Sequence, residues 1–574
     1  MKRWIFRDVP PGAPNAAWAE ELGISPTLLH LLWQRGLDTR DDMDAFLSAR
    51  LATLRPPAHW PGISEAAALF VQELVQGKKP VIWGDYDVDG ITAATIALDV
   101  LEAHGIAAGC HIPDRRSEGY GLNVPAIERL VAEGYGVLLT VDCGIADVAA
   151  IARARELGMT VIVTDHHLPP EELPPAHALC NPRLVPAEDC PCPDLAGVGV
   201  AFFLMAAVNN LLAKRTGRRY KMDDALDVTA LGTLADVMRL TGQNRVLVRG
   251  GLDKIAGARR PGMLALKTVS GLDPLARLTG GQVVFRLAPR INAAGRMGKA
   301  ELALRLLRCK DCAEAAKLAQ ALDALNTERK QEEERIWTAA REQTLRLMEE
   351  RPRPGLVVYG PDWHPGIIGI VASRLLEEFY RPVIILCDDG DSLKGSGRSI
   401  REFDLYAGLQ QCSELLSGFG GHRQAAGVRL PVTGLEAFRA AFERTCAAAL
   451  GPDPVQPTLV LESELDFATA GNQEFLRELD LLQPFGPGNA EPVFASPPLL
   501  IRDRLPLGQG GQHIRLKVQD TVSGVTLIAK AWRMAAEFPP AMIGKRIRIA
   551  YTPRIDMYNG IASVDLGIKD WQPA

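Results

Sequence analysis

Apolar and polar residues follow two alternating periods along the chain from about residue 64 onward. Short apolar runs of strand type lie at residues 80–83, 107–112, 136–142 and 159–165. Stretches with helical spacing lie before and between them, at 65–76, 91–104, 124–132 and 146–157. Strands that alternate with helices form parallel βαβ units, whose strands are covered on both faces. The pattern therefore predicts an α/β fold with a doubly wound parallel sheet.

The second half of the chain has a different pattern. A helical pattern runs from about 300 to 350, which at ~1.5 Å per residue would reach well over ~50 Å and predicts a connector between two lobes. A second α/β lobe follows, with strands at 356–359 and 382–386, a helix at 367–379 and glycine-rich turns at 394–399 and 418–427. From about 457, short strands with alternating basic and apolar residues indicate a small β-barrel.

Composition excludes several classes of protein. The chain has 574 residues, of which 47% are hydrophobic and 23% are charged, as expected for a globular protein of several domains. We find no apolar run long enough to span a bilayer, and the first residues lack the apolar core of a signal peptide. We therefore expect a cytoplasmic protein with no membrane attachment.

Charge and cysteine content narrow the picture further. The net charge is −5, but residues 501–574 hold 11 Lys and Arg against 6 Asp and Glu, so a basic module is attached to an acidic body. That arrangement suits a polyanionic substrate. The ten cysteines are scattered, as in a reduced protein. A zinc or iron–sulfur site at Cys180, Cys190 and Cys192 is disfavoured because no fourth ligand is evident, and the pair Cys309 and Cys312 has no second pair nearby.

The sequence GDYDVDG at residues 84–90 places Asp85, Asp87 and Asp89 at a strand-to-helix turn. In a parallel sheet such turns lie at the carboxyl edge, where ligands bind. Three acids within five residues repel one another unless a cation lies between them, and Mn²⁺ or Mg²⁺ suits oxygen ligands. A calcium loop of the D-x-D-x-D-G type would need a glutamate where Ile96 stands. Taken alone, the turn could also be a solvated acidic loop.

Further acids occur at the ends of later elements. Asp142 and Asp165 end two following strands, the pair His166 and His167 comes next, and Asp236 ends an apolar helical run. Each of these could merely cap a helix or lie on the surface. Because successive strand ends meet at one edge of a parallel sheet, however, they can converge on the acidic turn.

These motifs resemble those of a known superfamily. GDYDVDG at 84–90, VDCG at 141–144, TDHH at 164–167 and LGTLAD at 231–236 are similar to the ordered motifs of the DHH phosphoesterase superfamily. Further matches point within it to the bacterial RecJ family of single-strand-specific 5′-to-3′ DNA exonucleases, over roughly residues 60–570. They are PDR at 113–115, EGYGL at 118–122, LAGVGV at 195–200, PRINAAGR at 289–296, WHPGIIG at 363–369, GSGRS at 395–399, GFGGH at 418–422, AAG at 425–427 and PFGPGN at 484–489.

The resemblance implies two divalent metal ions, Mn²⁺ or Mg²⁺, as cofactors. It implies that Asp142 bridges them, that Asp85 and Asp87 complete one ligand shell, and that Asp89, His166 and Asp236 complete the other. His167 would face the scissile phosphate, and Asp165 would orient the histidines as a further catalytic residue. Members of the superfamily often carry a histidine where this chain has Asp85.

The resemblance also implies substrate-binding residues. Arg115, Tyr120, Ser396 and Arg398 would bind the 5′-terminal phosphate of the DNA. The path near the reacting phosphate would be lined by Arg290, Asn292, Arg296 and His422. The second lobe would be the superfamily's associated substrate-binding domain, and the C-terminal barrel would be an OB-type fold that holds single-stranded DNA.

The implied function is a single-stranded-DNA exonuclease that releases 5′-mononucleotides in DNA repair and recombination. The expected partners are single-stranded DNA with a 5′ end, a single-strand-binding protein and a helicase, and the expected state is a monomer. Two alternatives stay open: a phosphodiesterase for short oligonucleotides or cyclic dinucleotides, and a non-catalytic replication scaffold. We expect a helical appendage at 1–60, the catalytic domain at 61–300, a connecting helix at 301–350, the second lobe at 351–455 and the barrel at 456–574.

Overall fold

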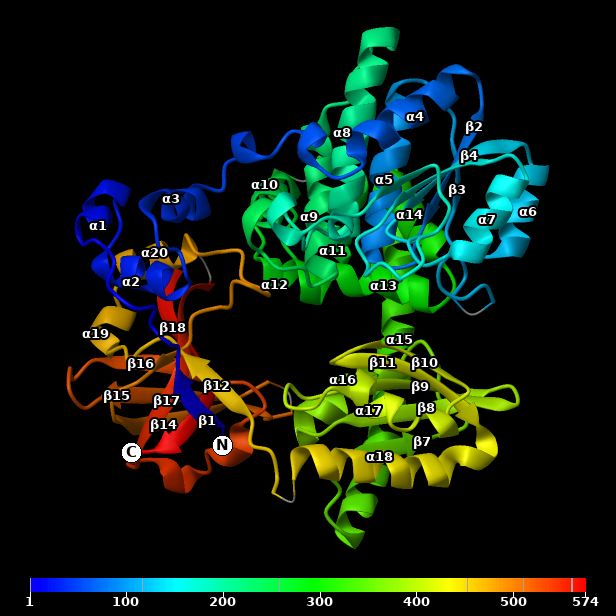
Figure 1. Ribbon diagram of the computed structural model, residues 1–574. Helices are drawn as coiled ribbons and strands as arrows, with labels where there is room; N and C mark the ends of the chain where they lie inside the picture. Colours follow the sequence, from blue (N-terminus) through cyan, green and yellow to red (C-terminus); the bar gives the residue numbers. More distant parts are fainter. Residues whose placement is uncertain (1, 116, 258, 452, 509, 559–560) are drawn as a thin grey trace. The chain divides into compact units, whose positions relative to one another are not determined.

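The computed structural model describes residues 2–115, 117–257, 259–451, 453–508, 510–558 and 561–574 (Figure 1). The chain folds into two compact units. Unit 1 comprises residues 1–289, 303–317 and 458–574, and unit 2 comprises residues 290–302 and 318–457. Each unit is described by itself below.

Unit 1 contains the predicted parallel sheet. Its five strands lie in the order β3-β2-β4-β5-β6, and every neighbouring pair is parallel. The strands are β2 (Lys79–Gly84), β3 (Gly109–His111), β4 (Tyr135–Val141), β5 (Thr160–Thr164) and β6 (Ala178–Cys180). The predicted α/β fold class is confirmed. The chain passes from β2 to β3 on one side and then returns to the other side of β2 for β4, β5 and β6. The direction in which strands are added therefore reverses between β2 and β4. Ligands bind at such a switch point, outside the carboxyl ends of the strands.

Helices cover both faces of this sheet (Figure 1). The helices are α4 (Ile63–Val75), α5 (Val88–Ala103), α6 (Val124–Ala132), α7 (Val148–Glu156), α8 (Gly197–Thr216) and α9 (Leu226–Ala235). Helices α6 and α7 pack on one face through a core that includes Trp83, Ile127 and Ile151, while α4, α5 and α8 contact the other. The central strands are buried on both faces, which explains their continuous apolar runs.

Helix α8 is long and apolar enough to cross a membrane by length and composition, a feature that the sequence interpretation missed. Its 18-residue apolar window has a mean hydropathy of 1.5, and 67% of that window is buried. It packs against α4, α5 and α9. Burial inside the protein accounts for its composition.

The remaining parts of unit 1 join the two ends of the chain. The N-terminal segment holds α1 (Ala17–Leu22), α2 (Pro26–Gln34) and α3 (Arg40–Ser48), but also a strand that the helical prediction missed, β1 (Arg3–Phe6). Strand β1 pairs in parallel with β12 (Thr458–Leu461). Helix α2 buries its leucines in the same core as the C-terminal strands. The N-terminal helices are therefore packed onto the C-terminal domain.

The C-terminal strands form one sheet in which β14, β15, β16 and β18 each have two neighbours and β17 has three, namely β13, β14 and β18. The elements are β13 (Phe494–Ala495), β14 (Leu499–Leu507), β15 (His513–Asp520), β16 (Thr526–Ala531), β17 (Arg546–Tyr558), β18 (Ile561–Pro573), α19 (Phe467–Ala470) and α20 (Gln473–Asp480). Alternating burial along β15 explains the alternating basic and apolar residues in its sequence. Three further helices complete the unit: α10 (Gly242–Gly257), α11 (Pro261–Val269) and α12 (Gly280–Gln282).

The prediction of one unbroken helix over 300–350 is wrong. Two helices, α14 (Ala300–Arg308) and α15 (Cys312–Glu350), are separated at residues 309–311. The side chain of Asp311 accepts a hydrogen bond from the backbone N–H of Glu314 at 2.7 Å, so it caps the start of α15. An aspartate followed three residues later by a glutamate is a helix-start signal that the sequence carries.

Unit 2 is built on a five-stranded sheet in the order β10-β11-β9-β8-β7. Its elements are α13 (Ala288–Arg296, which begins in unit 1), β7 (Leu356–Tyr359), α16 (Ile368–Phe379), β8 (Val383–Asp389), β9 (Ser392–Arg398), α17 (Leu405–Gln410), β10 (Gly418–His422), β11 (Ala425–Pro431) and α18 (Leu435–Leu450). The prediction of glycine-rich turns here is wrong, because these segments are antiparallel strands. Gly395 and Gly397 face packed neighbours: a Cβ on Gly395 would lie 2.5 Å from Leu386. They serve close packing.

Candidate metal centre and active site

The acidic turn lies between β2 and α5, at the switch point of the sheet. Asp87 is the N-cap of α5 and accepts hydrogen bonds from the backbone N–H groups of Asp89 and Gly90, at 2.8 and 3.1 Å. The two carboxylate oxygens of Asp89 accept from the N–H groups of Gly197 and Val198, both at 2.8 Å. These groups begin the 20-residue helix α8, whose positive end stabilises a carboxylate.

Asp142 follows β4 directly and has a left-handed backbone with φ of 63°. Its side chain is 2% exposed. A Cβ on Gly197 would lie 2.3 Å from Asp142 Oδ1, so only glycine lets the start of α8 approach this carboxylate. Strained backbone of this kind persists where the surrounding structure imposes it, commonly at functional sites.

Asp165 and the two histidines follow β5. Asp165 Oδ1 lies 2.7 Å from His167 Nδ1, and Asp165 Oδ2 accepts from the N–H group of Ile145 at 2.9 Å. The side chain of His166 is 6% exposed, whereas that of His167 is 41% exposed. The two rings therefore point to different surroundings.

Asp236 lies at the C-cap of α9, next to Val237, whose φ of 59° is rare for a β-branched residue. His166 Nε2 lies 3.1 Å from Asp142 Oδ1, 3.4 Å from Asp236 Oδ2 and 3.9 Å from Asp89 Oδ2. The negative end of α9 disfavours a carboxylate at this position. A cation is therefore needed there to offset both the helix end and the neighbouring acids.

The structure brings all of the predicted ligand residues together. In three groups, one ligand atom from each member lies within 4.8 Å of the others. The groups are Asp85, Asp87 and Asp142; Asp89, His166 and Asp236; and Asp142, His166 and His167. Four buried atoms of this cluster lack a hydrogen-bond partner among the described residues, namely Asp85 Oδ1, Asp142 Oδ1, His166 Nε2 and Asp236 Oδ2. Oxygen and imidazole donors that point at one another without partners fit hard divalent cations.

The electrostatics of the cluster support the same fit. Burial and the charge of neighbouring carboxylates raise the pKa of Asp89 to about 7 and that of Asp236 to about 9. Burial first, and then nearby acids, also raise the pKa values of Asp85 and Asp142. Burial lowers the pKa of His166 to about 3, which keeps its imidazole neutral and able to bind a metal. The carboxyl groups cannot all ionise at neutral pH unless cations enter.

Two of the predicted phosphate-binding residues adjoin this cluster. The Tyr120 hydroxyl lies 3.4 Å from His167 Nδ1, and its ring packs edge-on against that of Tyr86. The guanidinium of Arg115 lies 5.1 Å from the centre of the Tyr86 ring. Arg115, Tyr86, Tyr120 and His167 thus form a row that leads to the cluster, and Tyr86 was missed by sequence reasoning.

The other predicted phosphate-binding residues lie in unit 2. Arg398 Nη1 donates to Ser396 Oγ at 3.2 Å. A Cβ on Gly369, in the first turn of α16, would lie 2.9 Å from Ser396 Oγ. A serine, an arginine and a helix N-terminus in contact are suited to a phosphate group. His422 is exposed and stands level with Arg398, since both pair with Ala425.

The last three predicted residues lie on α13. Arg290 forms an ion pair with Asp323 at 2.8 Å, and Asn292 is partly buried. Arg296 donates to the carbonyl of Gly366 at 2.6 Å, just before α16. Arg296 therefore adjoins the helix terminus near Ser396, whereas Arg290 is tied to the connecting helix.

The cysteines belong to none of the potential metal groups found among the described residues. All ten are free thiols, and Cys180, Cys190 and Cys192 are buried. Burial raises the pKa of the Cys192 thiol to about 11 and also raises that of Cys190. These thiols are packed core groups.

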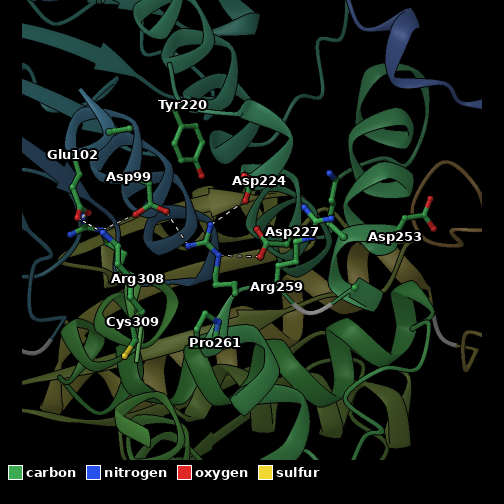
Figure 2. A pocket seen from close by; sticks show the side chains of 15 residues that line it. Asp99, Glu102, Tyr220, Asp224, Asp227, Asp253, Arg259, Pro261, Arg308 and Cys309 are labelled. Atoms are coloured by element: carbon green, nitrogen blue, oxygen red, sulfur yellow. Dashed lines mark hydrogen bonds and ion pairs between the residues drawn. The ribbon is translucent and has the colours of Figure 1, made fainter. Parts of the chain in front are cut away.

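A cavity of about 570 Å³ lies at the ends of α5 and α9 that are away from the metal-ligand cluster (Figure 2). Arg260 donates to Asp99 Oδ2 and Asp227 Oδ2, each at 3.0 Å, and so joins the two helices. Arg308 pairs with Asp99 and Glu102, at 3.0 and 2.7 Å. Asp99, Glu102 and Asp227 therefore each have a cationic partner within the protein.

Comparison with known proteins gives consistent matches. Family models match the DHH family N-terminal domain at residues 79–233, the DHHA1 domain at 353–448 and the RecJ OB domain at 461–570. The single-stranded-DNA-specific exonuclease RecJ of Salmonella typhimurium is 35% identical over 572 residues, which cover 96% of each chain. The crystal structure of RecJ from Thermus thermophilus in complex with Mn²⁺ has a TM-score of 0.82 and 33% identity, covering 100% of this chain and 80% of that one. The complex with Mg²⁺ from the same organism has a TM-score of 0.76 and 31% identity, covering 100% and 78%.

Proposed function

This chain belongs to the RecJ family, and from that membership we propose that it is a metal-dependent exonuclease specific for single-stranded DNA. The reaction is hydrolysis of phosphodiester bonds, in DNA repair and recombination. Its cofactors are two divalent metal ions, Mn²⁺ or Mg²⁺, in keeping with the complexes of the Thermus relative.

One observation carries the proposal: two groups of ligand atoms meet at the buried carboxylate of Asp142. Asp142 belongs to one group with Asp85 and Asp87, and its Oδ1 lies 3.1 Å from His166 in the other. A carboxylate shared by two sites is what a two-metal phosphodiesterase requires. The bound ions would supply an activated water and would stabilise the attacking and leaving oxygens of the displaced phosphate.

The residues of the chain have distinct roles in this proposal. Asp142 would serve both ions; Asp85 and Asp87 would complete the ligands of one, and Asp89, His166 and Asp236 would complete the ligands of the other. Contacts with the start of α8 hold Asp89 in place. The surrounding structure imposes the left-handed backbone of Asp142, as expected for a carboxylate that serves both groups.

His167 contacts the scissile phosphate. Burial lowers its pKa, but the hydrogen bond with Asp165 and the negative charges of Asp165, Asp236 and Asp89 together outweigh burial and raise the pKa to about 9, so the ring carries a positive charge near neutral pH. A cationic donor at 41% exposure suits a phosphate oxygen. The carboxylate of Asp165 orients the histidine pair, because it contacts the backbone N–H groups of both histidines and the ring of His167.

Two pairs of residues are each suited to a 5′-terminal phosphate, Arg115 with Tyr120 and Ser396 with Arg398. Arg290, Asn292, Arg296 and His422 contact the DNA strand. Cleavage from this end releases 5′-mononucleotides. Arg398→Ala should weaken the use of 5′-phosphorylated ends more than internal binding of the strand. Equal losses on both would count against a phosphate pocket.

The remaining parts of the proposal concern context. The C-terminal OB domain, with its surplus of basic residues, holds the strand. The chain acts as a cytoplasmic monomer together with a single-strand-binding protein and a helicase. Along the sequence we propose the five parts expected above, with boundaries at residues 60, 300, 350 and 455; the part over 301–350 is formed by α14 and α15.

A time course on a long 5′-labelled single strand and its duplex, with Mn²⁺ and with chelator, tests this function. We expect metal-dependent release of labelled mononucleotide from the single strand only. Degradation restricted to oligomers of a few nucleotides would instead support a short-substrate phosphodiesterase. Absence of hydrolysis on every substrate would support a scaffold.

A further inference from the structure

All four backbone polar groups of the His166–His167 pair bind to side chains. Asp165 Oδ1 accepts hydrogen bonds from both N–H groups, at 2.7 and 3.1 Å. The carbonyl of His166 accepts from Arg183 Nε, and the carbonyl of His167 accepts from Asn181 Nδ2, both at 2.9 Å. The peptide that aims both imidazoles is thus fixed from two sides.

The two carbonyl-binding residues come from the segment after the edge strand β6. Cys180 pairs with Thr164 across β5 and β6, and its carbonyl accepts from the N–H group of Asp165 at 3.0 Å. Asn181 therefore emerges beside the histidine pair, and it is 1% exposed. Its Oδ1 accepts from the N–H group of Arg183 at 2.8 Å, which caps the short helix 182–184 and holds the two residues together.

The same contacts extend to the segment that carries Asp236. Arg183 Nη2 lies 3.7 Å from Asp194 Oδ1, and Arg239 Nε lies 3.4 Å from Asp194 Oδ2. Asn244 donates to the carbonyls of Asp194 and Arg239, at 2.6 and 3.1 Å. Arg239 follows Asp236 by three residues, so one carboxylate links the histidine segment to the end of α9.

We infer that Asn181 and Arg183 are positioning residues that fix the His166–His167 peptide, so that His166 Nε2 faces the carboxylates of the cluster. This role rests on the proposed metal centre and deepens it. Groups that orient metal ligands typically change metal affinity or activity by about 10- to 100-fold. Neither side chain acts on substrate in this inference; both act through the histidines.

Two conservative variants test the role. Asn181→Asp keeps the oxygen that caps Arg183 but loses the donor to His167, and Arg183→Lys keeps the charge but loses the Nε donor to His166. We expect Mn²⁺ affinity, measured by calorimetry, and kcat on single-stranded DNA each to fall about 10- to 100-fold. KM for the DNA should stay within about twofold, because the proposed strand-binding residues other than His167 lie elsewhere, and the melting temperature in chelator should change little.

Arg155→Lys is the matched control. Arg155 Nη1 donates to the carbonyl of Pro175 at 2.8 Å, a contact of the same kind in the loop before β6. We expect this variant to behave as wild type. Wild-type Mn²⁺ affinity and kcat in both test variants, or equal losses in Arg155→Lys, would overturn the inference.

Stability and metal binding are separated by the same measurements. A large fall in melting temperature that accompanies the loss of activity in both variants would assign the two residues to stability and would also overturn the inference. Failure of the wild-type chain itself to bind Mn²⁺ and hydrolyse DNA is a different result, since it would overturn the proposed function.

Discussion

Helices α5 and α9 carry acidic side chains at both of their ends, but among the described residues only the acids at one end are paired with cationic side chains. At one end, Asp89 and Asp236 belong to a cluster in which several donor atoms lack partners among the described residues. At the other, Asp99 and Asp227 share the guanidinium of Arg260, at 3.0 Å each (Figure 2). The ends are separated by the length of α5, about 24 Å for 16 residues.

The difference shows how a protein distinguishes acids that support the fold from acids that bind metal. An acid that supports the fold is buried together with a cation supplied by the chain. An acid that binds metal is buried without a cation from the chain. Folding therefore leaves unbalanced negative charge, which a cation from solution neutralises. Substitutions at the metal-ligand end should therefore change hydrolysis and metal binding, whereas substitutions at the other end should change stability. For one pair of substitutions, the changes in the free energy of unfolding should have opposite signs.

The largest effect is expected for Asp142→Ala. Because this carboxylate belongs to both ligand groups, its loss should reduce hydrolysis by roughly 10³-fold or more while binding of single-stranded DNA largely survives. Initial rates and a filter-binding assay measure the two properties. Asp99→Ala, at the opposite end of α5, is the control and should keep most of its activity if folded. Retained hydrolysis in Asp142→Ala would remove Asp142 from the metal centre.

Arg260→Met should lower the free energy of unfolding by about 3–5 kcal/mol, because it leaves Asp227 buried without its cation and leaves Asp99 with Arg308 alone. Urea denaturation in the presence of Mn²⁺ measures this. The neighbouring Arg259 is exposed, so Arg259→Met should change stability by no more than about 0.5 kcal/mol. Equal effects of the two substitutions would show that the charge pairing around Arg260 is not what stabilises this end.

Mn²⁺ should stabilise the wild-type chain by about 2.7 kcal/mol when the free ion is at a hundred times its dissociation constant. Thermal or urea unfolding with Mn²⁺ and with chelator measures the increment. Asp142→Ala should lose most of it, whereas Arg260→Met should keep it, because the two sites lie at opposite helix ends. An increment that survives in Asp142→Ala would place the stabilising ion elsewhere.

The smallest effect concerns pH in the presence of chelator. The raised pKa values of Asp89, about 7, and Asp236, about 9, mean that the folded state binds these protons more tightly than the unfolded state. Their contribution is present at acidic pH and is lost as the pH rises through those values, so the metal-free protein should lose stability between about pH 5 and pH 9.

Asp236→Asn should weaken this pH dependence and should stabilise the metal-free protein at pH 8 by on the order of 1–2 kcal/mol, the equivalent of about one pKa unit. Asp99→Asn should have the opposite sign, because it deprives Arg260 and Arg308 of a partner. Guanidinium denaturation across pH measures both. Destabilisation by both substitutions would mean that the two ends do not differ in the proposed way.

The sequence predicted the parts of the molecule that depend on local pattern and on one general rule of parallel sheets. Strand ends at Asp85, Asp142 and Asp165 could be assigned from apolar runs, and their convergence follows from the carboxyl edge that they share. Asp236 was harder to place, since it comes from a helix end. It reaches the cluster only because α9 packs against α5.

Long-range packing accounts for what the sequence did not predict. Nothing near Gly197 or Val198 in the chain indicates that their N–H groups bind Asp89, more than a hundred residues away. Asn181 could be assigned as a cap, but not as the donor to His167. The glycines of β9 carry a turn signal that is overridden by close packing against β8 and β11.

The pairing of β1 with β12 has a consequence for the order of events during synthesis. Arg3 is made some 455 residues before its partner Thr458. At about 5–20 residues per second, β1 waits roughly 20 seconds to a minute and a half for its partner. Unit 2 lies entirely between them in the chain and has been synthesised by then. Strand β1 should therefore be among the last segments to reach its final hydrogen bonds, and pulse-labelled proteolysis of nascent chains would detect its late protection.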